Sequence, residues 1–455
     1  MGLIIGTNGN NILIGGSGTD FIYGLGGNDT MFGGGGADYI HTGSGLNTVR
    51  AGGGDDVVLL EAAGGDLDGE SGNDSLLLSF AAAASRFDLA AGTGRINGGV
   101  TFAAKNFENI TTGRGMDLVY GSNGANRIST GAGNDTIAAR GGADTIEAGA
   151  GDDAVLGDAG DDLLIAGTGR DHFDGGKDHD TLSYADSKGA IQVDVAAGTV
   201  KQAGDPTDTF ANIELFLGSG RSDVFTGAAA KAEFQGNAGD DYFYAGSGAE
   251  GIHGGAGTDT VSYIRSGSGV GVNLTTGEGS GGFAQGDRLS GIEHISASNG
   301  SDQLTGDGKA NILYGFAGDD DISGGGGDDI LVGGAGRDEL TGGAGADRFV
   351  FSAQDAGSVD TIYDFQRGVD TIDLWIDGDV HVAGDQDFTR LTSYAAPETQ
   401  AGFTAGTINV RYDATFNRTM VDVNVDDTIR NGVDPAELTI ALTGRVNLAL
   451  SDFDF

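Results

Sequence analysis

Acidic side chains recur at a fixed spacing in the middle of this chain. Residues 112–183 divide into nine-residue units, and the sixth place of each unit holds an aspartate or an asparagine. Carboxylate and amide oxygens are hard ligands, which Ca²⁺ prefers and which suit zinc or copper less well. The spacing therefore predicts a file of calcium ligands: Asp117, Asn126, Asp135, Asp144, Asp153, Asp162, Asp171 and Asp180.

Three further arrays repeat this pattern. The third array is the weakest, because Ala232 replaces the acid in one unit, Glu250 is a longer carboxylate and Lys231 lies where an acid often lies. We expect fewer bound ions and more mobility there. The candidate ligands are Asn11, Asp20, Asp29, Asp38, Asp56 and Asp74 in the first array, Asp223, Asp241 and Asp259 in the third, and Asp302, Asn311, Asp320, Asp329, Asp338 and Asp347 in the fourth.

Glycines before each acid indicate which elements position it. A glycine-rich segment disfavours helix and regular strand but permits a tight turn with positive φ. The residues that follow, such as Thr136, Ile137 and Ala138, alternate like a very short strand with one side chain pointing inward. Two units close one coil of a parallel β-roll, and successive coils stack about 4.8 Å apart. The eighth place should form the core: Val119, Ile128, Ile137, Ile146, Val155, Leu164, Phe173 and Leu182.

Stacking of the coils brings the acids close together. Two carboxylates about 4.8 Å apart repel by roughly 3.5 kcal/mol at an effective dielectric constant of 20. A file of carboxylates therefore needs cations between its coils. The alternative is that each Gly-Asp segment is only a turn with local hydrogen bonds. Repetition in register over four arrays favours the metal.

Three segments break the nine-residue register and resemble one another. Alternating residues such as Ile191, Val193 and Val195 predict small antiparallel excursions of two or three strands, each of which caps one roll and starts the next. The predicted order is a first roll (1–78), a first insertion (79–111), a second roll (112–183), a second insertion (184–217), a third and weaker roll (218–262), a third insertion (263–296), a fourth roll (297–350) and a C-terminal β domain (351–455).

The predicted fold is all-β, with tandem calcium-bound parallel β-rolls of nonapeptide repeats and a β-rich C-terminal region. After residue 350 the glycine turns stop and short alternating stretches follow. Asp422, Asn424, Asp426 and Asp427 form a separate group of oxygens there. This group either holds one more ion or is an exposed turn.

Composition limits the possible partners. The chain has 88 glycines, 67 acidic residues and 24 Lys or Arg, with a net charge of −43. That charge repels nucleic acid and anionic membranes, so neither nucleic-acid binding nor membrane insertion is expected. Without metal the chain resembles a disordered polymer, so metal binding should contribute directly to folding.

Calcium would also replace disulfides, since the chain has no cysteine. No apolar stretch approaches the length that spans a membrane. Residues 1–6 lack the basic and hydrophobic regions of a cleaved secretory signal, and the array begins at Gly6, so we expect neither such a signal nor a preceding domain.

Catalytic motifs are not evident. The sequence contains neither H-E-x-x-H nor G-x-S-x-G. His41 and His253 occupy ninth places of repeats, and His172 and His179 flank ordinary units. Adjacent acids such as Asp152 and Asp153 imitate a glycosidase pair, but they recur in the phase of the repeat. We therefore expect no enzymatic activity from this chain.

The repeat G-G-x-G-x-D-x-U-x resembles that of RTX (haemolysin-type calcium-binding) proteins over residues 6–350. Residues 351–374 are similar to the segment after the last roll of serralysin-type metalloproteases, and the insertions loosely resemble those of secreted alginate epimerases. The resemblance implies calcium-bound rolls and an uncleaved C-terminal signal for the type I secretion machinery. That signal often ends in an acid followed by hydrophobic residues, which residues 452–455 match. A secreted, extracellular or cell-surface location follows from the resemblance.

Two functions stay open. The first is a structural or interaction protein of a surface layer, matrix or adhesion system, whose calcium-folded rolls associate with each other or with cell-surface polysaccharide. The second is the non-catalytic module of an extracellular enzyme that acts on polysaccharide, or a polysaccharide-binding protein. Ice binding would need flat ranks of Thr or Asn, but the fifth place varies through Thr19, Asn28, Ala37 and Asp55.

Overall fold

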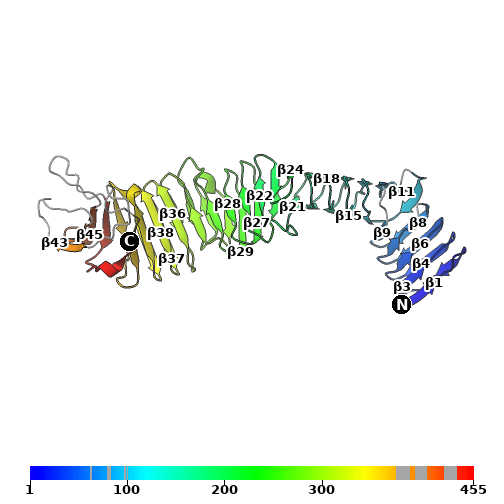
Figure 1. The fold of residues 1–455 in the computed structure, drawn as a ribbon, viewed down its shortest axis with the longest axis horizontal. Helices are drawn as coiled ribbons and strands as arrows, with labels where there is room; N and C mark the ends of the chain where they lie inside the picture. Colours follow the sequence, from blue (N-terminus) through cyan, green and yellow to red (C-terminus); the bar gives the residue numbers. More distant parts are fainter. Residues whose placement is uncertain are drawn as a thin grey trace. The chain divides into compact units, whose positions relative to one another are not determined.

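The computed structural model describes residues 1–61, 64–78, 84–96, 99, 101–375, 390–394, 407–424 and 438–454 (Figure 1). Throughout these ranges the chain forms short β-strands, three 3₁₀ turns and no α-helix, so the predicted all-β class is confirmed. None of the described segments is a helix long and apolar enough to cross a membrane. The chain divides into two compact units, residues 1–221 and 222–455.

Unit 1 begins with the strands of the first array, which lie on alternating sides of the coil. They are β1 (Gly2–Ile5), β2 (Ile12–Ile14), β3 (Asp20–Tyr23), β4 (Thr30–Gly35), β5 (Tyr39–His41), β6 (Asn47–Gly53), β7 (Val57–Leu59), β8 (Gly65–Ser71) and β9 (Ser75–Leu77). The first insertion contributes β10 (Ser85–Asp88), β11 (Thr93–Ile96) and β12 (Phe102–Lys105). The second array and the second insertion follow as β13 (Asn109–Thr111), β14 (Leu118–Tyr120), β15 (Arg127–Ser129), β16 (Thr136–Ala138), β17 (Thr145–Glu147), β18 (Ala154–Ala159), β19 (Leu163–Ile165), β20 (His172–Lys177), β21 (Thr181–Ser183), β22 (Ile191–Asp194), β23 (Thr199–Gln202), β24 (Thr207–Ala211) and β25 (Leu215–Leu217).

Unit 2 has the same two-sided construction. Its third array and third insertion are β26 (Val224–Thr226), β27 (Glu233–Ala238), β28 (Tyr242–Tyr244), β29 (Gly251–Ala256), β30 (Thr260–Ser262), β31 (Gly271–Asn273), β32 (Glu278–Ser280), η1 (Gly282–Ala284) and β33 (Arg288–Ser290). The fourth array is β34 (His294–Ser296), β35 (Gln303–Thr305), β36 (Ile312–Ala317), β37 (Asp321–Gly326), β38 (Ile330–Ala335), β39 (Glu339–Ala344) and β40 (Arg348–Ser352). The C-terminal region is η2 (Ala353–Asp355), β41 (Val359–Ile362), β42 (Thr371–Trp375), β43 (Arg390–Tyr394), β44 (Thr407–Asp413), β45 (Arg418–Asn424), β46 (Leu438–Thr443), η3 (Leu450–Asp452) and β47 (Phe453–Asp454).

Parallel strands in the arrays pair with a shift of two repeats. Strand β16 pairs with β18, which places Ile137 beside Val155, and β15 pairs with β17, which places Ile128 beside Ile146. Two nonapeptides therefore make one coil, as the glycine spacing predicts. The turn glycines permit this stacking: Gly151 has φ of 142°, and a Cβ there would collide with the carbonyl of Gly133 in the neighbouring coil.

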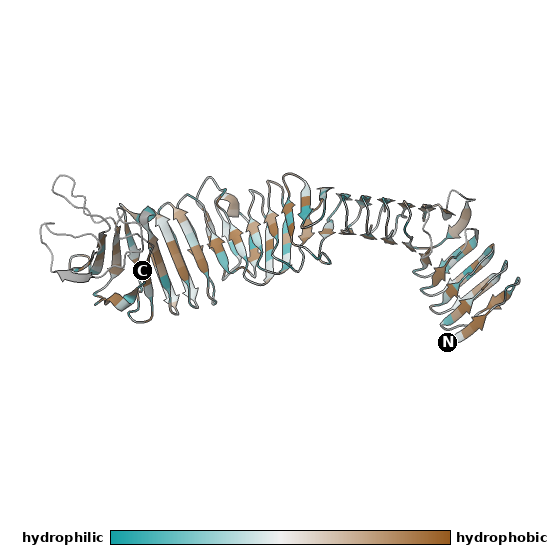
Figure 2. Ribbon diagram, in the orientation of Figure 1, coloured by the Kyte–Doolittle hydropathy of each residue, from teal (hydrophilic) through white to brown (hydrophobic). Residues whose placement is uncertain are grey.

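Eighth-place side chains fill the interior of both units. Ile137 and Val155 are fully buried, as are Ile40 in the first array and Leu331 in the fourth. Hydrophobic residues recur along the strands of both units (brown in Figure 2). The inward alternation predicted for each three-residue strand is therefore confirmed.

The strands of the first and third insertions pair with strands of the arrays on both sides, so the sheets continue through these insertions. In the first insertion β10, β11 and β12 form an antiparallel meander, while β12 pairs in parallel with β8 and β10 pairs in parallel with β14. On the other side of the coil β9 pairs directly with β13. The third insertion repeats this arrangement, with β33 on β29, β31 on β35 and β30 directly on β34. The interpretation that these two insertions cap one roll and start the next is therefore wrong: each lengthens one sheet by a meander while the other sheet continues.

The described C-terminal strands extend the fourth array. Strand β41 pairs with β39 and β42 pairs with β40, both in parallel. Strands β44, β45 and β46 form an antiparallel meander that joins β41 through β46. Near the C terminus, β47 pairs with β42.

Candidate calcium sites in the turns

The sixth-place acids form a hydrogen-bonded ladder inside the turns. Within an array, the backbone N–H of a sixth residue typically donates to Oδ1 of the sixth residue one coil later, as Asp38 does to Asp56 at 2.7 Å and Asp320 to Asp338 at 3.0 Å. This geometry follows from the 18-residue register, which places equal positions of successive coils one above the other. The carboxylates are buried, with Asp56 and Asp338 both fully inaccessible to solvent.

The second carboxylate oxygen, Oδ2, has no protein donor at most of these positions. A buried acceptor without a partner is costly, and a buried charge more so. The acids whose Oδ2 is buried and unpaired include Asp29, Asp38, Asp56, Asp74, Asp135, Asp144, Asp153, Asp162, Asp171, Asp180, Asp241, Asp259, Asp320, Asp329, Asp338 and Asp347. A cation between the coils would satisfy these oxygens.

Where a repeat begins with glycine, that glycine leaves space beside this oxygen. A Cβ on Gly24 would lie 2.9 Å from Oδ2 of Asp29 and would also meet the carbonyl oxygen of Thr42 in the next coil. Gly315 shows the same relation to Oδ2 of Asp320 and the carbonyl of Gly333. Carboxylate and carbonyl oxygens thus converge on a space that a side chain would fill. This donor set and the unpaired oxygens fit Ca²⁺, which takes oxygen ligands only.

Electrostatics point the same way. Burial raises the pKa of Asp144, Asp171 and Asp320 to about 7 each. Neighbouring acids add to this effect, such as Asp162 beside Asp144. Without a cation, these buried carboxylates therefore bind protons near neutral pH. A bound metal ion would neutralise their charge instead.

At several of the predicted ligand positions Oδ2 is not unpaired, because a nearby protein group donates a hydrogen bond to it. Gly16 N–H donates to Oδ2 of Asp20 at 2.6 Å, and the hydroxyl of Thr112 donates to Oδ2 of Asp117 at 2.5 Å. Ser298 N–H donates to Oδ2 of Asp302 at 3.0 Å. Asp223 continues the ladder by donating its N–H to Asp241 Oδ1 at 2.7 Å.

The predicted asparagines also act locally. Oδ1 of Asn11, Asn126 and Asn311 accepts a backbone N–H from the turn of its own repeat, at 2.6–2.8 Å. The amide nitrogens of Asn126 and Asn311 donate to the carbonyls of Glu108 and Glu293, at 2.8 and 3.0 Å. These amides join coils without a net charge.

Three glutamates of the insertions were not among the predicted site residues, although they continue the ladder. Oε2 of Glu108 accepts the N–H of Asp74 at 2.8 Å, Glu214 accepts that of Asp180 at 2.9 Å, and Glu293 accepts that of Asp259 at 3.1 Å. Each glutamate follows its partner by 34 residues instead of 18. The sequence does contain a signal for these glutamates. The three insertions end alike, with a glutamate close to an isoleucine or phenylalanine.

In the third array Glu250 closes its turn differently. Both of its carboxylate oxygens accept the N–H of Gly246 at 3.0 Å. Burial raises the pKa of Glu250 to about 8. The longer side chain thus lies over its own turn, and Ala232 offers no ligand atom in its repeat. Both observations agree with the prediction of fewer ions in this array.

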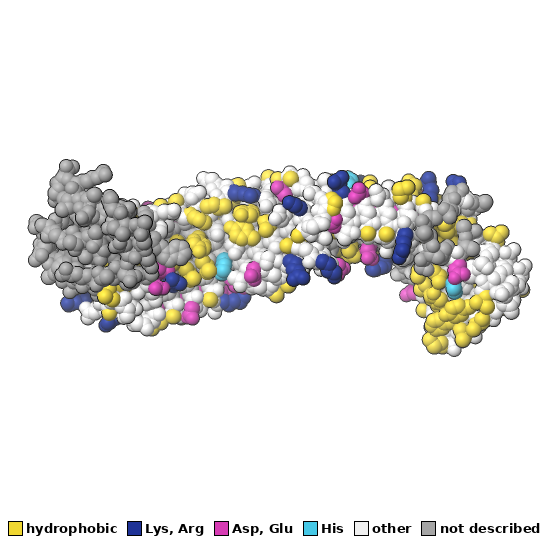
Figure 3. All heavy atoms as spheres, in the orientation of Figure 1, with side chains coloured by type: hydrophobic (Ala, Val, Ile, Leu, Met, Phe, Trp, Pro, Cys, Tyr) yellow, Lys and Arg dark blue, Asp and Glu magenta, His cyan; other side chains and the backbone are white. Residues whose placement is uncertain are grey.

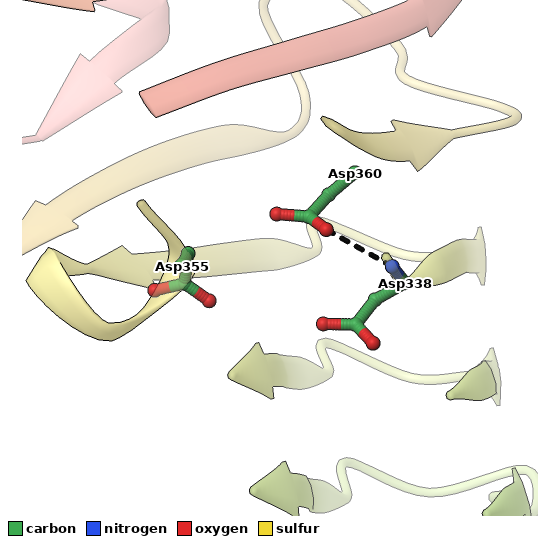
Figure 4. Close-up of side chains that lie close together, drawn as sticks. All are labelled: Asp338, Asp355 and Asp360. Carbon is green, nitrogen blue, oxygen red and sulfur yellow. Dashed lines mark hydrogen bonds between the residues drawn. The ribbon is translucent and has the colours of Figure 1, made fainter. Parts of the chain in front are cut away.

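A cluster of three acids lies where the fourth array meets the C-terminal region (Figure 4). Asp338, Asp355 and Asp360 are buried, and one carboxylate oxygen of each lies within 4.8 Å of the others. Asp338 N–H donates to Oδ1 of Asp360 at 2.9 Å, so Asp360 extends the ladder beyond the repeats. Asp338 Oδ2, Asp355 Oδ1 and Asp360 Oδ2 all lack a donor. The prediction from sequence included Asp338 but missed Asp355 and Asp360, because their spacing departs from nine.

Other candidates from the sequence have ordinary surroundings. His172 and His253 lie on the surface beside the hydroxyls of Thr209 and Ser290. In the pair Asp152 and Asp153, the first side chain is exposed and the second is buried in the ladder, so the two do not face a common space. Asp422 accepts from Arg411 Nε at 3.0 Å. Asp426 and Asp427 lie outside the described residues.

Comparison with known families agrees with this geometry. The model of the RTX calcium-binding nonapeptide repeat (four copies) matches residues 5–40, 32–62, 111–146, 120–155, 147–182 and 233–261. The model of the peptidase M10 serralysin C-terminal region matches residues 294–454. The predicted resemblance is confirmed, and so is the binding of Ca²⁺ at multiple sites of the repeats. These matches indicate a secreted protein that leaves by type I secretion.

Two solved structures are among those that the chain matches. One is a subunit of the Azotobacter vinelandii mannuronan C5-epimerase, with 26% identity, a TM-score of 0.24 and coverage of 34% of this chain and 80% of that chain. The other is the extracellular lipase LipA of Serratia marcescens, with 15% identity, a TM-score of 0.21 and coverage of 74% of this chain and 40% of that chain. No curated protein sequence matches the chain significantly.

Proposed function

Because this chain belongs to the secreted RTX calcium-binding proteins and carries a serralysin-type C-terminal region, we propose that it is a structural protein that folds on extracellular Ca²⁺ and then associates with copies of itself at the cell surface. A surface layer or an extracellular matrix is the setting that such a protein suits.

Calcium-dependent folding is supported by the unpaired Oδ2 atoms of the ladder. The acids that carry them lie in register one coil apart, and the whole chain has a charge of −43. We propose that these carboxylates hold the ions, which supply positive charge between successive coils. Without ions the files repel, which keeps the chain unfolded where calcium is scarce and open to passage through a secretion channel.

Self-association is supported by one observation, a largely apolar face on the first array, in which His41 of β5 pairs with the neighbouring Glu61 at 3.0 Å. Seventh- and ninth-place side chains point outward from β1, β3, β5 and β7, and here all of them except His41 are apolar. This outer apolar face consists of Leu3, Ile5, Phe21, Tyr23, Tyr39, Val57 and Leu59. Leu3 and Ile5 are 66% and 58% exposed, and the rings of Phe21 and Tyr39 lie 6.1 Å apart. Figure 3 shows hydrophobic side chains gathered on unit 1 near the N terminus.

Strands β15 and β17 of the second array carry polar side chains at the matching positions of the same sheet, although β19 beside them carries Leu163 and Ile165. Arg127, Thr145, Ser129 and Glu147 point outward from β15 and β17. The nonapeptide fold therefore does not itself require the outer apolar face. Exposed contiguous apolar patches mark interaction sites. A second copy is the partner that we propose, because the apolar residues of this face carry no charge and the nearby carboxylate of Glu61 is paired with His41, so two acidic chains can meet here with little repulsion.

The test is a calcium titration of the full chain, followed on one sample by circular dichroism and light scattering. We expect β-structure and particle size to increase over the same range of calcium concentration. A compact monomer at saturating calcium would contradict self-association and leave calcium-dependent folding intact. An unchanged dichroism spectrum would contradict both.

A second candidate function, polysaccharide binding, is favoured by a polar groove on the third insertion. The groove has a volume of about 480 Å³, and its lining includes Asn273, Thr276, Glu278, Gln303 and Thr305. Amide and hydroxyl groups suit the hydroxyls of a sugar. Binding of polysaccharide by the calcium-loaded monomer, lost on Gln303→Ala, would favour this second function.

We further propose that the chain has no catalytic role of its own. Three of the described histidines have ordinary contacts: His172 and His253 lie beside hydroxyls, and His41 pairs with Glu61 at 3.0 Å. In the adjacent pair Asp152 and Asp153, the second acid belongs to the ladder and the first is exposed. Assays of the calcium-loaded chain on acidic polysaccharides and lipid esters should give no turnover, and measurable turnover would contradict this proposal.

A further inference from the structure

Two insertions contain an aspartate that belongs to the ladder without belonging to a nonapeptide. In the second insertion, Oδ1 of Asp208 accepts the N–H of Asp171 at 2.8 Å. In the third insertion, Oδ1 of Asp287 accepts the N–H of Glu250 at 2.9 Å. Both spacings are 37 residues. These two carboxylates therefore have the position of a sixth-place acid in their coils.

Their other oxygen is not left free for a metal ion. The hydroxyl of Tyr184 donates to Oδ2 of Asp208 at 2.7 Å, and that of Tyr263 donates to Oδ2 of Asp287 at 3.0 Å. All four side chains are buried: Tyr184 and Asp208 are 2% and 3% exposed, and Tyr263 and Asp287 are both fully buried. The same atom, Oδ2, has no donor in the array positions Asp171 and Asp259.

We propose that Tyr184 and Tyr263 substitute for calcium, with each phenol hydroxyl taking the place at Oδ2 that a cation takes in the arrays. The coils of Asp208 and Asp287 then close without metal. The insertions thus divide the calcium-binding arrays by coils that fold independently of calcium.

A phenol suits this role because it stays a donor. Burial raises the pKa of both tyrosines further above their ordinary value, and the neighbouring aspartates add to the shift. The hydroxyl therefore keeps its proton over the physiological range. The large ring is part of the core at the same time, so one residue supplies both the packing and the hydrogen bond.

Protein groups also satisfy some of the ladder positions that directly follow an insertion. The amide of Asn311 donates to the carbonyl of Glu293 at 3.0 Å, and Ser298 donates to Asp302 through both its backbone N–H and its hydroxyl. After the first insertion, Thr112 and Asn126 of the second array have the corresponding contacts. Donation by a protein group to a ladder acid is therefore not confined to the two tyrosines.

The decisive experiment counts calcium ions per full-length chain at saturating calcium, by equilibrium dialysis and elemental analysis. The variants Asp208→Asn and Asp287→Asn should bind as many ions as the unchanged chain. The matched variants Asp153→Asn and Asp320→Asn, at array positions with an unpaired Oδ2, should bind fewer ions. Loss of ions from Asp208→Asn or Asp287→Asn equal to the loss in the matched variants would overturn the proposal.

A second variant keeps the test decisive if an asparagine variant does not fold. Tyr263→Phe preserves the ring but leaves Oδ2 of Asp287 without a donor. We expect an unchanged number of ions and a lower thermal unfolding midpoint at saturating calcium. The double variant Tyr263→Phe/Asp287→Asn should recover part of the lost stability. A fall in the number of ions for Tyr263→Phe would mean that the phenol is itself a ligand, which contradicts the substitution. Light scattering is not needed for this test, so its result does not depend on self-association.

Discussion

The backbone N–H of Asp144 donates to Oδ1 of Asp162, eighteen residues later, at 2.7 Å. Oδ1 of Asp162 thus links two successive coils, while its Oδ2 is buried with no protein donor. The same side chain that sets the stacking of two coils also creates the need for a cation between them. Folding and calcium binding are therefore coupled at each coil of the arrays.

Replacing Asp162 with asparagine separates these two roles. Asp162→Asn keeps the acceptor for the N–H of Asp144 but removes the charge that faces the cation. We expect a cost of about 1.5–3 kcal/mol in folding free energy at a fixed calcium concentration, as for the loss of a charged partner. Circular dichroism during calcium titration should show a higher calcium midpoint than in the unchanged chain.

The neighbouring residue provides the control for that substitution. Asp161 is exposed, and its Oδ1 accepts the N–H of His179 at 3.0 Å, an acceptor that asparagine retains. Asp161→Asn makes the same change in net charge and should leave the calcium midpoint unchanged. Equal shifts in both variants would mean that the effect is general electrostatics and would remove the case for Asp162 as a ligand.

Protons should partly replace calcium in the metal-free chain. Burial raises the pKa of Asp144 to about 7 and that of Asp360 to about 8, from an ordinary value of 3.8. The negative charge of Asp162 also raises the pKa of Asp144. The charges of Asp338, Asp355 and Asp319 have the same effect on Asp360. The folded state therefore binds more protons than the unfolded state between pH 4 and 8. This contribution to stability is complete below about pH 4 and is lost as the pH rises through 7 to 8.

Circular dichroism of the calcium-free chain from pH 8 to pH 4 checks this sign. We expect β-structure to increase on acidification and the calcium midpoint of the loaded chain to rise as protons compete for the carboxylates. A continuous loss of β-structure on acidification without calcium would contradict the burial of these acids.

Nine-residue periodicity was sufficient to predict much of this fold. Ile137 and its equivalents mark the buried position of each strand, and glycines mark the turns. Because these signals are local and repeat in register, the pairing of each strand with the strand 18 residues later followed from them.

Contacts that depend on the insertions could not be read from that periodicity. Glu108 reaches the ladder 34 residues after Asp74, and Asp360 follows Asp338 by 22, so neither has a repeat phase. Whether a sixth-place acid needs a cation also depends on donors elsewhere in the chain. Tyr184 and Asp208 are 24 residues apart, and only the folded meander brings them together.

Glu250 offers a further test of which acids bind metal. Its carboxylate accepts the N–H of Gly246, and burial raises its pKa to about 8. Glu250→Gln keeps an oxygen acceptor in a neutral side chain, so we expect unchanged ion binding at pH 7. Glu250→Ala leaves the buried N–H of Gly246 unsatisfied and should cost about 1–3 kcal/mol of stability. Ion counting and thermal unfolding of both variants check this prediction, and a loss of calcium in Glu250→Gln would contradict it.

The outer apolar face should be needed for assembly but not for folding. Leu3 and Ile5 are exposed, so Leu3→Asp/Ile5→Asp should retain the calcium-induced dichroism signal while introducing two charges per copy into the proposed contact. We expect the calcium-dependent growth in light scattering to disappear, because apposed copies would bury unpaired carboxylates. The matched variant Thr136→Asp/Thr145→Asp adds the same charge to strands of the second array, β16 and β17, and should still assemble. If both double variants assemble like the unchanged chain, copies do not meet through this face. If both fail, the added charge alone prevents association, and the contact cannot be assigned to Leu3 and Ile5.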